Sequence, residues 1–197
     1  MVEELDIDDD KVRVAVLQYS DNTSVYFNLM AHGSKRDIIY AVRSLRHKGG
    51  KQRNTGAALE FVQDFIFNST SGSRVIHGVP QILFLLTGGD SGDDISGAAA
   101  DLHKNGVLSF AIGMKNAKQE ELEEISSSSS YIFNLPVFGE LLSVQQEIVS
   151  FVQVGKLLKP PLGKNYPRFS FSLTFDPFPQ APMELHQHLK NICRAAS

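Results

Sequence analysis

The stretch ILFLLTGGDSGDD, residues 82–94, decides the fold class of this chain. Its first five residues are apolar, and they run into a threonine, two glycines and three aspartates. A short and continuously apolar run is typical of a strand that is buried on both faces, as in a parallel sheet. The polar residues after it predict a loop at the carboxyl end of that strand, where open α/β sheets place their ligands.

Segments with strand and helix patterns alternate around this run. Strands are predicted at 11–20, 24–29, 79–87, 107–114 and 131–135, the first two joined as a hairpin. Helices are predicted at 33–45, 55–67, 93–106, 118–126 and 137–153. Ser34 is the expected N-cap of the first helix, and Asn105-Gly106 the expected end of the third. This order indicates an α/β sandwich with a mostly parallel sheet.

The composition excludes several classes of function. The chain has 197 residues, 42% of them hydrophobic, and a formal net charge of −3. This charge gives no reason to expect nucleic acid as a partner, and no apolar run is long enough for membrane insertion. No pattern of catalytic nucleophile and base is present, so we do not expect an enzyme. Cys193 is the single cysteine and cannot form an internal disulfide.

Five blocks carry a resemblance to a known family: VRVAVLQYSD, NTGAALEFV, ILFLLTGG, SFAIG and ELEEIS. In this order they resemble von Willebrand factor type A domains, and most of all the A modules of collagen type VI alpha chains. The resemblance covers residues 5–154. It implies a Rossmann-like sandwich that lacks the family's first strand and first helix, so residues 1–154 are expected to form a partial domain. It also implies a non-catalytic protein-interaction or adhesion module of the extracellular matrix.

The resemblance further implies a metal-ion-dependent adhesion site, which in the family binds Mg²⁺. Thr55 falls on the family's metal-binding threonine, but Gly88 stands where the family has an aspartate, and the Asp-x-Ser-x-Ser loop is absent. We therefore expect a degenerate site, no cofactor, and at most weak Mg²⁺ binding. Three aspartates remain on the loop, at 90, 93 and 94. They allow a metal site, but the favoured interpretation is that they cap the helix predicted at 93–106.

A nucleotide-binding alternative rests on the glycines at 88, 89 and 92. Their spacing departs from G-x-G-x-x-G, no lysine follows as in a P-loop, and the aspartates would repel a phosphate. Asn22 and Asn68 begin triplets of the N-glycosylation type, which matter if the chain is secreted. The basic stretch 46–53 is expected to be a solvated loop, with contact to an acidic partner as the alternative.

The C-terminal segment differs in composition from the rest. Six of the eight prolines lie between 160 and 182, so a domain boundary is placed near 155–160, and residues 155–197 are expected to be a poorly ordered tail. Within this tail, RFSFSLTF at 168–175 has the period-two pattern of a strand, and a short helix is expected at 183–195. Its alternate residues are polar, unlike those of a central parallel strand. We therefore predict that it does not replace the missing central strand and lies at an edge or without order.

Two localisations follow from these observations. The family resemblance implies the extracellular matrix, with matrix proteins as partners. The acidic N-terminus lacks the layout of a secretion signal, which leaves a cytoplasmic, truncated or pseudogene-derived chain with lost or diverted binding as the alternative. Because the missing strand would expose strand edges, residues 1–154 alone are expected to aggregate or to be partly unfolded.

Overall fold

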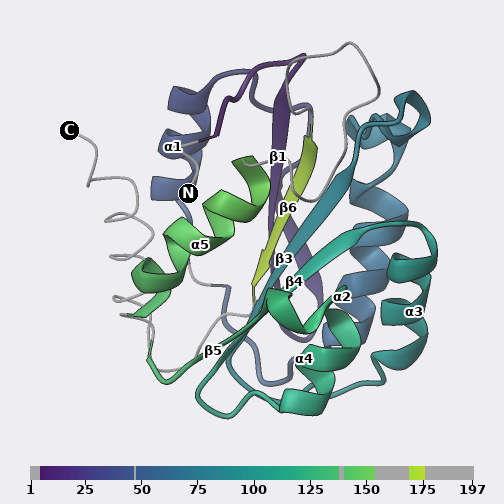
Figure 1. The fold of residues 1–197 in the computed structure, drawn as a ribbon, viewed down its shortest axis with the longest axis vertical. Coiled ribbons are helices and arrows are strands. Elements are labelled where there is room, and N and C mark those ends of the chain that lie inside the picture. The colour runs from purple at the N-terminus through teal and green to yellow at the C-terminus, as the bar shows by residue number, and fades with distance from the viewer. Residues whose placement is uncertain (1–4, 47, 138–139, 154–168, 176–197) are drawn as a thin grey trace.

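The computed structural model describes residues 5–46, 48–137, 140–153 and 169–175 of the chain. Its strands form one six-stranded sheet in the order β2-β1-β6-β3-β4-β5 (Figure 1). The strands are β1 (Val12–Tyr19), β2 (Thr23–Phe27), β3 (Gln81–Thr87), β4 (Leu108–Met114), β5 (Ile132–Leu135) and β6 (Phe169–Phe175). Among the strands of the described residues, only β1 and β2 pair in antiparallel orientation. The predicted hairpin and the mostly parallel sheet are therefore confirmed.

Helices cover both faces of this sheet, as Figure 1 shows. They are α1 (Lys35–Arg43), α2 (Thr55–Phe61), α3 (Ser96–Lys104), α4 (Gln119–Ile125) and α5 (Leu141–Gln153). Helices α1 and α5 lie on one face, and α2, α3 and α4 on the other. Each face has its own cluster of buried apolar side chains, and alternate residues of β1, β3 and β4 belong to opposite clusters. None of the helices that the structure describes is long and apolar enough to cross a bilayer.

The position of β6 overturns one prediction. Residues 169–175 were expected at an edge or without order, but β6 lies between β1 and β3 and pairs in parallel with both. Residue 172, for example, is opposite Ala15 on one side and Leu83 on the other. Without β6, the facing backbone groups of β1 and β3 would be unpaired inside the protein, which costs more than burying small hydroxyl groups. The polar side chains of β6 therefore do not exclude it from the centre.

The polar residues of β6 are buried. Ser170, Ser172 and Thr174 are each 0% exposed. Ser172 and Thr174 share a hydroxyl contact of 3.4 Å, whereas Ser170 Oγ has no hydrogen-bond partner. The sheet thus has a central strand that is small and polar on one face. The boundary predicted near 155–160 and the helix predicted at 183–195 lie outside the described residues and stay predictions.

Other elements agree with the sequence to within a few residues. Ser34 is the N-cap of α1, as predicted, and its Oγ accepts a hydrogen bond from Asp37 N. The helix predicted at 55–67 is an α-helix only to Phe61, and a π-helical turn, Val62–Ile66, continues it. Helix α3 begins at Ser96 rather than residue 93. The aspartates at 93 and 94 are therefore in the loop before this helix, where the candidate site lies.

Candidate functional site at the carboxyl edge

Three loops meet where the parallel strands end, and we call them the carboxyl edge: residues 20–22, 51–55 and 88–94. Backbone hydrogen bonds join them, from Asn54 N to Ser20 O at 3.0 Å and from Gly92 N to Arg53 O at 2.7 Å. Asp21 adds to this, because its carboxylate accepts hydrogen bonds from Lys51 N and Gln52 N at 3.2 and 3.0 Å. The carboxyl edge is thus a connected surface built from loops that are distant in sequence.

Asp93 is held inside this surface. Its carboxylate accepts hydrogen bonds from Gly56 N and Ala57 N, both at 2.9 Å, and from Ser91 Oγ at 2.7 Å. These backbone N–H groups belong to the first turn of α2, where no intrahelical partner exists and negative charge is favoured. Asp93 therefore caps α2. The sequence predicted capping by the acidic loop, but assigned it to the helix that follows.

Asp94 and Asp90 have other roles. Asp94 Oδ1 accepts a hydrogen bond from Ser96 N at 3.0 Å, so this residue does serve the predicted helix, α3. Asp90 Oδ2 forms an ion pair with Lys118 Nζ at 3.1 Å. The hydrogen bond and the charge of Asp90 raise the pKa of Lys118 above its ordinary value. The three aspartates therefore point to three separate partners and do not converge on a shared point.

Thr55, the residue that falls on the family's metal-binding threonine, is buried with 2% of its surface exposed. Its N–H donates to Ser91 Oγ at 3.2 Å, and its hydroxyl donates to the Tyr19 hydroxyl at 3.4 Å. The next residue, Gly56, is required by close packing, because a Cβ there would lie 2.0 Å from Asp94 O. Loop 88–94 is thereby pressed against the start of α2, and the Thr55 hydroxyl faces the protein interior.

Gly88 and Gly89 are the first two residues after β3, and neither offers a carboxylate as a metal ligand. The guanidinium of Arg53 lies next to Gly89, where a Cβ would be 3.0 Å from Arg53 Cζ. The positive charge of this guanidinium repels a metal cation and so opposes metal binding at this place. Among the residues that the structure describes, no three His, Cys, Asp or Glu side chains gather as a metal-binding group. The residues of the carboxyl edge thus do not fit the Mg²⁺ site that the family resemblance implies.

The loop is equally unsuited to phosphate. Phosphate-binding loops offer free backbone N–H groups, whereas here Ser91 N donates to Glu121 Oε2 at 2.8 Å and Gly92 N donates to Arg53 O. Three residues of this network were not identified from the sequence as part of a site: Tyr19, Ser91 and Glu121. Each acts through a contact between segments that lie far apart in the chain, which no local pattern reveals.

The two glycosylation-type triplets lie at opposite ends of the parallel strands. Asn22 is exposed and belongs to the carboxyl edge, just before β2. Asn68 is exposed and follows the π-helical turn, near the point where β3 begins, as the hydrogen bond from Gln81 Nε2 to Phe67 O shows. The structure therefore places Asn22 at the carboxyl edge, where Thr55 and Gly88 also lie, and keeps Asn68 at the other end of the strands.

Comparisons with known proteins agree with this architecture. The model of the von Willebrand factor type A domain matches residues 1–147. The collagen alpha-4(VI) chain of Mus musculus is 37% identical over 146 residues, which is 73% of this chain and 6% of that collagen. The collagen alpha-1(XII) chain of Notophthalmus viridescens is 34% identical over 183 residues, 92% of this chain and 19% of the collagen. An alignment of that extent includes β6, because β6 ends 22 residues before the C-terminus.

A solved structure with the same fold comes from the mussel byssus. Proximal thread matrix protein 1 has a TM-score of 0.67 and 25% identity, over 70% of this chain and 36% of that protein. Another structure of that protein, 26% identical, has zinc in its metal-ion-dependent adhesion site. The chain spans less than a fifth of the collagens and about a third of the mussel protein. The match to the family model and the collagen relatives together show that this chain belongs to the von Willebrand factor type A domain family.

Proposed function

We propose that this chain is a non-catalytic protein-interaction module of the extracellular-matrix type, and that it binds its partner through the carboxyl edge without a metal ion. The proposal is supported by family membership and by the collagen relatives, whose names place them in the matrix. Open α/β sheets bind their ligands at this edge. The observation that carries the metal-independent part is the use of Asp93 as a helix cap, beside a buried Thr55 and a glycine at position 88.

The chemistry of the edge favours a protein partner with charges of both signs. Lys51, Asp90 and Lys118 are exposed there, and Lys115, which follows β4, is exposed at the same end of the sheet. Exposed charges of this kind steer association and set specificity more than they add affinity. Binding is therefore expected to be sensitive to salt and insensitive to chelators.

The test uses the full chain and two purified matrix proteins, collagen VI and collagen XII, immobilised on a biosensor. We expect saturable binding to at least one of them that is unchanged in EDTA. Lys51→Glu together with Lys115→Glu should weaken this binding at least tenfold. Lys104→Glu is the matched control, because Lys104 is exposed at the end of α3 that is distant from the carboxyl edge. This variant should bind like the wild-type chain. Binding that disappears in EDTA, or equal loss in the control, contradicts the proposal.

A further inference from the structure

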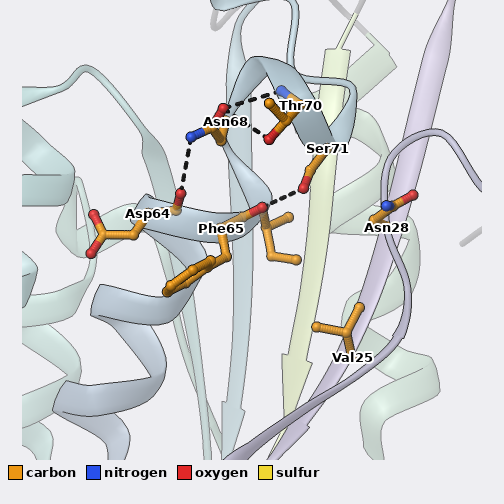
Figure 2. A pocket seen from close by; sticks show the side chains of 8 residues that line it. Val25, Asn28, Asp64, Phe65, Asn68, Thr70 and Ser71 are labelled. Carbon is orange, nitrogen blue, oxygen red and sulfur yellow. Dashed lines mark hydrogen bonds between the residues drawn. The ribbon is translucent and has the colours of Figure 1, made fainter.

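The loop Asn68–Thr70 holds the side chains of a glycosylation acceptor in contact with one another. Asn68 Oδ1 accepts hydrogen bonds from Thr70 N at 3.1 Å and from Thr70 Oγ1 at 3.2 Å (Figure 2). Asn68 Nδ2 donates to Asp64 O at 3.2 Å. All three residues of the triplet are exposed. The amide that would be modified and the hydroxyl that the triplet requires are thus neighbours on an accessible turn.

A shallow pocket adjoins this turn, and Figure 2 shows its walls. Its lining combines polar groups with two exposed apolar side chains, Phe65 at 58% and Val25 at 41% exposure. Phe65 lies three residues before Asn68 on the π-helical turn, and its ring stacks on Phe61 with centroids 4.7 Å apart. The ring is thereby fixed from one side and open to solvent on the other. The negative face of such a ring attracts the C–H groups on the apolar side of a sugar.

We infer that Asn68 carries an N-linked glycan and that the first N-acetylglucosamine of this glycan packs against Phe65. In the transfer, C1 of the sugar leaves the diphosphate of its lipid carrier and bonds to Asn68 Nδ2, which loses one proton. The modified amide keeps one N–H, so it can still donate to Asp64 O. The inference rests on the proposed function only in requiring that the chain enter the secretory route.

The location of Asn68 is compatible with partner binding. Asn68 lies near the start of β3, whereas Thr55 and Gly88 lie at the carboxyl edge. A glycan on Asn68 therefore leaves the carboxyl edge open. At Asn22 the situation differs, because Thr23 and Ser24 belong to β2 and pair with β1, and the Ser24 hydroxyl accepts a hydrogen bond from Lys48 Nζ. A glycan on Asn22 would stand on the surface proposed for the partner.

The first experiment maps the modification. The full chain with Asn22→Gln is secreted from mammalian cells behind an added signal, and its glycopeptides are analysed by mass spectrometry. We expect a glycan on Asn68 that is lost in Thr70→Ala and retained in Ser69→Ala. A secreted, folded chain in which Asn68 is unmodified overturns the inference. This outcome says nothing against matrix binding, which is measured separately on unmodified protein.

The second experiment tests the contact with Phe65. The glycan is trimmed to a single N-acetylglucosamine, and the melting temperature is compared with that of the same chain made in bacteria. The sugar should raise the melting temperature by about 1–6 °C, the range expected for one aromatic contact in a chain of this size. The rise should vanish in Phe65→Ala and persist in Tyr40→Ala, which removes an exposed aromatic ring from α1 on the opposite face. An equal rise in both variants overturns the proposed packing.

Discussion

Asp93→Ala separates the two roles that an acidic loop at this edge can have. In the wild-type chain the carboxylate of Asp93 accepts hydrogen bonds from two backbone N–H groups at 2.9 Å. One of them belongs to Gly56, which is buried, so the variant leaves a desolvated donor without a partner. Loss of a helix cap costs about 0.5–2 kcal/mol, and an unsatisfied buried group costs about 1–3 kcal/mol. The two costs describe partly the same lost hydrogen bonds, so they do not add in full.

We therefore expect Asp93→Ala to lower the free energy of unfolding by about 2–3 kcal/mol. For a chain of this length, that corresponds to a fall in Tm of about 4–12 °C. The assay is thermal unfolding followed by circular dichroism, with the Mg²⁺ concentration varied and with EDTA as reference. Because Asp93 acts on the helix and not on a metal, the loss should be equal in both conditions.

Asp90→Ala is the matched control. Asp90 lies on the same loop, but its ion pair with Lys118 is solvent-exposed, and such pairs contribute little to stability. Its Tm should therefore remain within about 3 °C of the wild type. The capping argument is refuted if Asp93→Ala melts like Asp90→Ala. It is also refuted if millimolar Mg²⁺ raises the wild-type Tm and Asp93→Ala removes that rise, since Asp93 would then be a metal ligand.

Two further predictions concern buried and partly buried hydroxyl groups. Ser170→Ala should raise the free energy of unfolding by about 1 kcal/mol in a denaturant titration, because Ser170 Oγ is buried without a hydrogen-bond partner. A lower free energy of unfolding in this variant would show that the hydroxyl has a hydrogen-bond partner in the wild-type chain. Burial of the Tyr26 ring raises the pKa of its hydroxyl above the ordinary value of 10.0. The contribution of Tyr26 to stability is thus fully present below pH 10 and is lost as the pH rises through the pKa of the folded state. An ultraviolet titration, with Tyr26→Phe as reference, should show that Tyr26 ionises at higher pH in the folded chain than in the unfolded chain.

The sequence predicted most of the fold because the dominant signals are local. The apolar run at 82–86 identified β3 as a strand buried on both faces, and the cap at Ser34 fixed the start of α1. The site was less accessible to such reasoning. Asp93 reaches a helix that begins 38 residues earlier in the chain, and only the packing of loop 88–94 on α2 reveals that partner.

The placement of β6 was predicted wrongly for a physical reason. The alternation of Ser170, Ser172 and Thr174 with apolar residues favours a strand with one solvated face. The competing term is the cost of leaving the inner edges of β1 and β3 unpaired, and this term depends on the whole sheet. Residue 172 lies opposite Ala15, so one neighbour of this buried polar position is itself small. Local patterning and tertiary pairing conflict here, and pairing decides the outcome.

The central claim is that β6 completes the sheet between β1 and β3, and residue-resolved amide hydrogen exchange on the full chain tests it most directly. In a parallel sheet, successive N–H groups of a central strand point alternately to its two neighbours, so every one of them is bonded, whereas an edge strand has every second one free. The account predicts slow exchange at consecutive amides from Ser170 to Thr174, comparable to that of residues 82–86 in β3. Protection at alternate residues only, or rapid exchange throughout β6, would contradict it.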